Sequence, residues 1–133
     1  MATKLAPHPQ ERIFTRWNHT VSGWFASPHE LEEKPGVFII ATQGFQLPFV
    51  LDVSESDNVK FSVLNNERRT FWRRNALGGI LYAAIYTQDA ESPFLSEFER
   101  RNIEQHIRKM EQPVFGADEL FARPLSNLTP KLS

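Results

Sequence analysis

The stretch EKPGVFIIATQGFQLPFVLDVSES, residues 33–56, decides the fold expected of this chain. Its first half contains VFIIAT, 37–42, a continuous run of apolar and β-branched residues of strand length. Gly44 is typical of a turn, and LPFVLDV, 47–53, then returns as a second strand. Pro48 lies near the start of that strand, where a missing N–H donor is tolerated. The stretch therefore predicts a β-hairpin.

The segments after the hairpin complete an α/β pattern. Residues 59–66 and 68–77 predict two short helices, and ILYAAIYT, 80–87, predicts a third strand that is apolar on both faces and therefore central. A long helix is expected to open at Ser92 and to end before Pro113. This order predicts a small α/β (α+β) domain with a three-stranded, mainly antiparallel sheet flanked by helices. It contains neither a βαβ nucleotide-binding unit nor a glycine-rich phosphate loop.

Residue types predict how the helices begin and which faces they bury. Ser27 and Pro28 are the expected cap and first residue of a short helical turn. The helix over 59–66 is offered N-cap oxygens by Ser54, Ser56 and Asp57. The long helix is expected to bury one stripe: Phe94, Phe98, Ile103, Ile107 and Met110.

The chain of 133 residues fits one domain with a modest core. Residues 1–34 are expected to form an N-terminal arm and an aromatic flap, because four aromatic side chains occur in IFTRWNHTVSGWF without a regular period. Residues 35–116 form the predicted core, and 117–133 a tail that packs on the core or is disordered.

Composition restricts the possible partners. The 15 Lys and Arg residues against 16 Asp and Glu give a net charge of -1, so any attraction to nucleic acid must come from a local patch. The absence of cysteine excludes disulfides, thiolate zinc sites and cysteine nucleophiles. Residues 1–12 lack the apolar core of a signal peptide, and no run approaches the roughly 20 apolar residues of a membrane helix. We expect a cytoplasmic protein of bacterial or phage origin that does not contact a membrane.

From about Pro35 to Gly116, the order of elements and several local strings resemble the GIY-YIG nuclease superfamily. PGVFII is similar to the first strand of that family, and PFVLDVSES occupies the place of PVYVGES. FWRRN and GGILYAAI fall where many small bacterial members have a helix and a third strand. ERRNIEQHIRKMEQPVFG resembles the closing helix. The resemblance implies a GIY-YIG-like fold.

The resemblance also implies catalytic roles, most of which this chain has lost. The family uses a tyrosine from each of the first two strands, an arginine from the next helix, a metal-binding glutamate and often a closing asparagine. A phenol cannot be replaced by Phe38, since its ring has no hydroxyl to transfer a proton. The matching positions are Phe38, Val50 with Asp52 at the glycine, Ser62 or by a one-residue shift Phe61, retained Glu104, and Gly116. The resemblance therefore implies a catalytically degenerate domain that needs no cofactor.

A rebuilt metal site is an alternative. Asp52 and Glu104 offer two carboxylates to Mg²⁺ or Mn²⁺, with Arg68 or Arg69 reaching in to stabilise charge, and such a site would make the chain a metal-dependent nuclease. The competing interpretations are that Glu104 bridges arginines of its own helix and that Asp52 caps the helix that follows it. The four histidines show no metal-ligand spacing.

A basic patch with an aromatic residue among its arginines is the strongest local charge feature: Arg68, Arg69, Trp72, Arg73 and Arg74. Phosphate contacts together with base stacking predict a nucleic-acid-binding surface there. The alternative is a solvated helix face with Trp72 turned into the core. Our leading hypothesis is a catalytically degenerate nucleic-acid-binding module. A protein-interaction or regulatory module, acting as a decoy or inhibitor, is the second hypothesis, with the aromatic first segment as a possible anchor.

Overall fold

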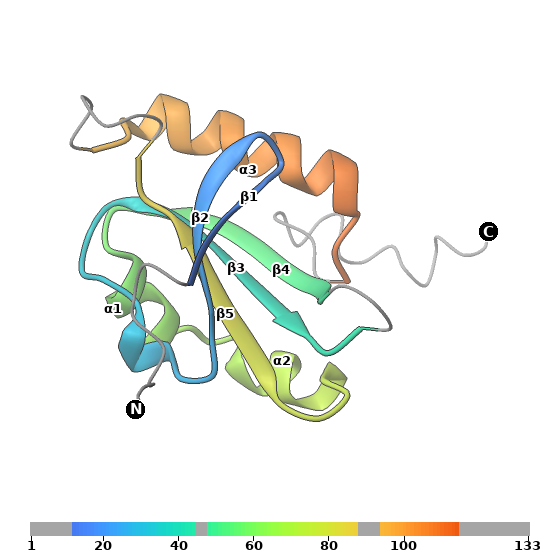
Figure 1. The fold of residues 1–133 in the computed structure, drawn as a ribbon. Helices are drawn as coiled ribbons and strands as arrows, with labels where there is room; N and C mark the ends of the chain where they lie inside the picture. The colour runs from blue at the N-terminus through green and yellow to red at the C-terminus, as the bar shows by residue number, and fades with distance from the viewer. Residues whose placement is uncertain (1–11, 45–47, 88–93, 115–133) are drawn as a thin grey trace, which may run out of the picture.

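The computed structural model describes residues 12–44, 48–87 and 94–114, and its centre is a five-stranded antiparallel sheet (Figure 1). The strands lie in the order β1-β2-β5-β3-β4. Their bounds are β1 Ile13–Arg16, β2 His19–Phe25, β3 Gly36–Thr42, β4 Phe49–Ser56 and β5 Ile80–Ile85. The helices are η2 Pro28–Glu30, a 3₁₀ turn, followed by α1 Val59–Leu64, α2 Arg69–Asn75 and α3 Glu97–Glu111. The expected α+β class with an antiparallel sheet is confirmed, whereas the prediction of three strands is wrong.

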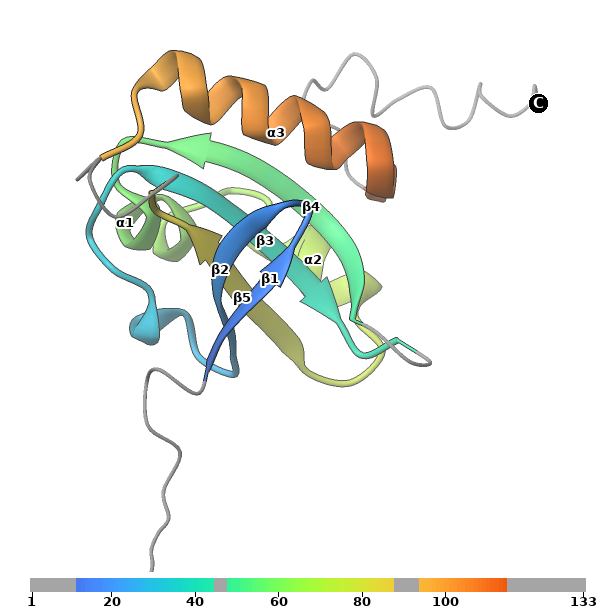
Figure 2. The ribbon, with the colours of Figure 1, turned by 45° about the horizontal axis from the view of Figure 1, so that its top comes forward.

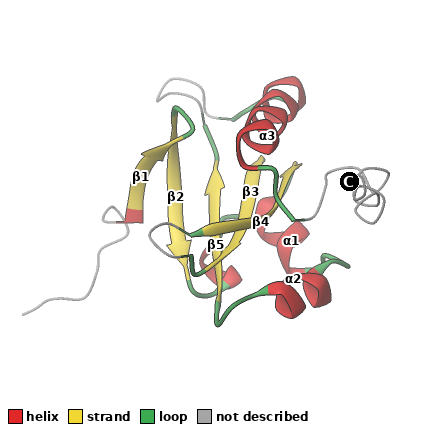
Figure 3. Ribbon diagram, turned by 90° about the vertical axis from the view of Figure 1, so that its right-hand side faces the viewer, coloured by secondary structure: helices red, strands yellow, loops and turns green. Residues whose placement is uncertain are grey.

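The two additional strands come from the segment predicted as an aromatic flap. Trp17 and Asn18 have φ angles of 56° and 65° and form a two-residue turn that pairs Arg16 with His19. Positive φ at both turn residues is the hairpin geometry that matches the natural twist of strands. The hairpin joins the sheet because β2 pairs with β5, as Figure 3 shows for β1, β2 and β5.

β3 lies between β4 and β5, and all its residues are buried. Successive side chains of β3 alternate between two cores. Val37 and Ile39 belong to the cluster that includes Ile103 and Ile107 of α3, whereas Phe38 packs with residues of α1 and α2. The sheet is therefore the middle of three layers, with α3 on one face and α1, α2 and η2 on the other (Figure 2).

A bulge in β4 decides where its acidic residue points. Ile40 pairs with Asp52, but Ala41 pairs with Val50, so Leu51 is an extra residue in β4. A bulge changes the direction of the side chains beside it. Asp52 consequently meets α2, on the same face of the sheet as Leu51.

The helices begin differently from the prediction in two places. Ser27 caps η2 and Pro28 follows it, as predicted. However, β4 continues through Ser56, and Asn58 caps α1 by accepting a hydrogen bond from the N–H of Phe61. The cap of α3 is Ser96, whereas Ser92 lies outside the described residues.

The buried face of α3 is less apolar than predicted. Ile103 and Ile107 are buried as expected. The rest of that face consists of Arg100 and Glu104, whose side chains pair with β4. The remaining members of the predicted stripe are exposed: Phe94 by 56%, Phe98 by 74% and Met110 by 58%. Among the described helices, none has both the length and the apolar character needed to cross a membrane.

Candidate nucleic-acid interface

The carboxylate of Asp52 is the buried centre of a charged cluster. Nη1 of Arg68 lies 3.1 Å from both carboxylate oxygens, and Nε1 of Trp72 donates to Oδ2 at 2.8 Å. Nη2 of Arg108 approaches Oδ1 at 3.3 Å from α3. Burial raises the pKa of Asp52 to about 6, although these three donors and the backbone of Val53 each lower it part of the way. The carboxylate lies between two guanidinium groups, which favour its ionised form against the cost of burial.

Glu104 and Arg108 close the exposed edge of the sheet. They lie one turn apart on α3 and form an ion pair of 3.0 Å. Glu104 Oε1 accepts a 3.0 Å hydrogen bond from the backbone N–H of Glu55, and Arg108 donates to the backbone carbonyl of Val53. Both backbone groups belong to β4, which is an edge strand. The two side chains therefore occupy hydrogen-bonding positions that a further strand would otherwise take.

The residues at the expected catalytic positions have structural partners. Phe38 is 1% exposed, and its ring packs edge-on against Trp72 with the ring centroids 6.3 Å apart. Val50 is buried in the core that faces α3. Ser62 lies on α1, where its Oγ is 2.5 Å from Oγ of Ser56. Gly116 lies outside the described residues.

The two residues considered as metal ligands are joined through an arginine. Arg108 contacts the carboxylate of Glu104 through Nε and that of Asp52 through Nη2. In the described part of the chain, no group of three or more His, Cys, Asp or Glu residues has the placement of a metal site. In this arrangement the guanidinium group of Arg108 compensates the negative charges of Glu104 and Asp52.

The five residues of the predicted basic patch separate into two groups. Trp72 is 1% exposed and the partly exposed Arg68 is bonded to Asp52, so both belong to the cluster around that carboxylate. Arg69, Arg73 and Arg74 are exposed on α2. Nη1 of Arg69 donates to the carbonyl of Leu64 at 2.8 Å.

Arg73 and Arg74 keep their guanidinium groups available. Within residues 12–44, 48–87 and 94–114, neither makes a hydrogen bond or an ion pair. Their position at the end of α2 is electrostatically favourable because the helix dipole is negative there. These two cations can therefore bind an external anion without breaking an internal contact.

An open pocket of about 360 Å³ lies beside Arg73. It is lined by Ala26, Arg73, Ala76, Gly78, Ile80 and Tyr82. Burial raises the pKa of the Tyr82 phenol, while the nearby charges of Arg69 and Arg73 lower it in part. The phenol therefore lies within the electrostatic field of two α2 arginines. We call Arg69, Arg73, Arg74 and Tyr82 the α2 surface.

Tyr82 was missed by the sequence interpretation, which treated its strand as uniformly apolar. The available signal was the spacing of Tyr82. It lies two residues after Ile80, which directly follows the Gly78-Gly79 turn. Side chains two apart share one face of a strand, so a phenol had to lie beside Ile80 on the α2 side.

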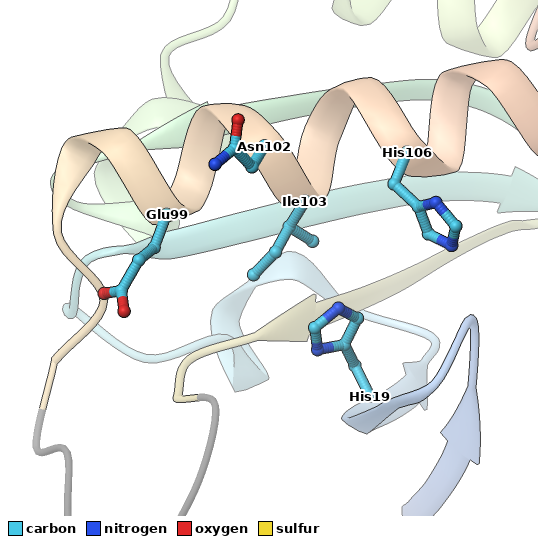
Figure 4. A pocket seen from close by; sticks show the side chains of 5 residues that line it. All are labelled: His19, Glu99, Asn102, Ile103 and His106. Atoms are coloured by element: carbon cyan, nitrogen blue, oxygen red, sulfur yellow. The ribbon is translucent and has the colours of Figure 1, made fainter.

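A second pocket, of about 320 Å³, lies near α3. Figure 4 shows Glu99, Asn102, Ile103 and His106 of α3 around it, with His19 of β2 on the other side. Burial lowers the pKa of His19, and the charge of His106 lowers it further. Burial and the neighbouring imidazole of His106 therefore both disfavour protonation of His19.

None of the family models, curated proteins or solved structures compared with this chain matches it.

Proposed function

We propose that this chain is a nucleic-acid-binding module of GIY-YIG-like architecture that has lost nuclease chemistry. The observation that carries the proposal is the α2 surface, where exposed arginines lie beside a half-buried tyrosine and an open pocket and form no ion pair with the described part of the chain. Guanidinium groups bind phosphates, and an adjoining aromatic ring can receive a base. A local patch is sufficient because short-range phosphate contacts do not require a positive net charge.

The loss of hydrolysis is supported by what now surrounds the former catalytic positions. A phenol or water that attacks a phosphodiester needs an accessible position and a cation beside it. Phe38 is buried and has no hydroxyl, and Ser62 carries no charge. Asp52 and Glu104 already have guanidinium partners. The hairpin β3–β4, followed by α1, α2, β5 and α3, is the element order on which the GIY-YIG-like part of the proposal rests.

A protein-interaction module is the second candidate, favoured by one observation. Phe94 lies just before the N-cap of α3 and Phe98 lies in its first turn, and they are 56% and 74% exposed. Exposed aromatic rings are common anchors in protein interfaces. A protein held by these rings would stay bound at salt concentrations that release a nucleic acid.

The proposal is tested by replacing Arg73 and Arg74, the α2 arginines that bond to no residue in the structurally described ranges. In Arg73→Ala/Arg74→Ala we expect affinity for a labelled oligonucleotide to fall at least about tenfold. We expect the slope of log affinity against log salt to flatten by about 2, one for each lost phosphate contact. Fluorescence anisotropy at several salt concentrations measures both quantities.

The control variant is Arg101→Ala/Lys109→Ala, which removes the same amount of charge from the exposed side of α3. It should keep the affinity and the salt slope of the wild type. Equal losses in the two double variants would show that net charge, rather than the α2 surface, governs binding.

A further inference from the structure

The pocket beside Arg73 has walls of small residues. Ala26 follows β2, Ala76 ends α2, and Gly78 lies in the turn before β5. A Cβ atom added to Gly78 or Gly79 would meet nothing within 4 Å. The space around this turn is therefore open on the side where a side chain would project.

The inner side of the pocket is formed by β5. Ile80 and Tyr82 lie two residues apart and both pack against the core that faces α2. An aliphatic side chain beside an aromatic ring offers an apolar surface, and the phenol adds one polar group. Such a surface suits the face of a planar heterocycle.

The volume of the pocket and the charges beside it restrict the class of ligand that it can bind. The pocket, at about 360 Å³, lies at the lower end of the roughly 300–1,000 Å³ range of small-molecule sites, so it has room for one nucleotide rather than for a base pair within a duplex. Arg73 lines the pocket itself, and Arg69 is close enough to Tyr82 to influence its phenol. The backbone phosphate of a nucleotide whose base occupies the pocket would therefore meet guanidinium groups.

We propose that this pocket receives one unpaired base of a single-stranded nucleic acid, with the adjoining phosphate on Arg73. The inference rests on the proposed function and names its substrate class. Bases of a duplex are stacked and paired, and extracting one costs a few kcal/mol, so single strands bind in preference to duplexes. Stacking is tolerant of sequence, so the preference concerns strandedness rather than a motif.

The test fills the pocket without touching an arginine. Ala26 is exposed, so Ala26→Leu adds bulk to the pocket while leaving the core intact. The probes are a labelled single-stranded DNA of about 12 nucleotides and the duplex made from it, within the size range of known single-strand sites. We expect the wild type to bind the single strand about tenfold more tightly than the duplex.

In Ala26→Leu we expect this preference to disappear while duplex affinity stays unchanged. The unchanged duplex affinity also shows that the variant is folded. Ala76→Leu fills the same pocket from α2 and should give the same result. Gln105→Leu, an exposed substitution on α3, should behave as the wild type.

The outcomes separate this inference from the proposed function. Equal binding of single strand and duplex by the wild type, or a preference that survives both filling variants, would overturn the inference and leave the α2 surface as a phosphate-binding site. An absence of binding to either probe would overturn both.

Discussion

Asp52 receives donors from three parts of the chain. Arg68 precedes α2, Trp72 lies within it, and Arg108 comes from α3. A buried carboxylate without such partners would cost several kcal/mol, so these donors are necessary for the residue to be ionised inside the protein. Trp72 satisfies its indole N–H in the same contact, which explains how a residue with a polar group packs at 1% exposure.

His19 gives the molecule a predictable response to pH. Because burial and then the charge of His106 lower the pKa of His19, the unfolded chain binds this proton more readily than the folded protein. The contribution of His19 to the free energy of unfolding should therefore decrease as pH falls below 6.5, the ordinary value for histidine, toward the lower pKa of the folded state. Asp52 acts in the opposite direction in this range, because burial raises its pKa to about 6. Urea unfolding between about pH 5 and pH 8 measures this dependence.

His19→Gln should remove this contribution, so the difference in the free energy of unfolding between the wild type and the variant should change in favour of the variant as pH falls below 6.5. His29→Gln replaces an exposed histidine and should retain the dependence of the wild type. An imidazole of His19 that titrates by NMR at or above 6.5 would contradict this prediction.

At the scale of the element, β4 and α3 form one unit. The backbone of β4 contacts Glu104 and Arg108, and Glu55 forms a 2.9 Å ion pair with Arg100. Ion pairs and backbone hydrogen bonds therefore join the edge strand to the helix alongside the apolar contacts of Ile103 and Ile107.

Removing the carboxylate of Glu104 should open this edge locally. In Glu104→Ala we expect the backbone amide of Glu55 to exchange its hydrogen about tenfold faster, because its acceptor is lost and a net hydrogen bond contributes about 1 kcal/mol. Hydrogen exchange followed by NMR gives the rate for each amide. Gln105→Ala, at an exposed position on the same helix, serves as the control.

Acceleration of all β4 amides by the same factor would instead indicate general destabilisation and would contradict a local edge contact. An unchanged rate at Glu55 would contradict the hydrogen bond itself.

The hairpin of β3 and β4 follows from the apolar runs of the sequence, but the hairpin of β1 and β2 does not. Its turn is Trp17-Asn18, and a tryptophan at positive φ is an uncommon turn residue. The register shift between Gly23 and Phe25 also interrupts the alternation from which a strand is usually inferred. The aromatic residues of this segment therefore suggested irregular packing although they belong to regular strands.

The direction of the Asp52 side chain could not be predicted from the sequence either. Strict alternation from Val50 would direct it toward α3, and the bulge at Leu51 reverses this. The same limit applies to the arginines. Sequence spacing alone does not show that Arg68 is bonded to Asp52, whereas Arg73 and Arg74 have no partner among the described residues. The patch was therefore predictable as a group, and its division between core and surface was not.

At the scale of the whole molecule, charge is sorted by location. Asp52 and Glu104, two acidic residues considered as metal ligands, are paired with arginines of α3 or of the segment before α2. The α2 surface instead presents cations that are not paired in this way, on the face of the sheet opposite α3. Because the net charge of the chain is -1, any attraction of phosphates depends on the local arrangement of cations at the α2 surface.

Binding without cleavage is tested most directly by titrating the protein with labelled single-stranded and double-stranded DNA and RNA in the presence of Mn²⁺. Anisotropy and strand length are followed in the same samples at two salt concentrations. We predict binding that weakens with salt while every strand keeps its length. An absence of binding at both salt concentrations would contradict the proposed function. Metal-dependent shortening of the strands that is lost in Glu104→Ala would show instead that Asp52 and Glu104 form a rebuilt nuclease site.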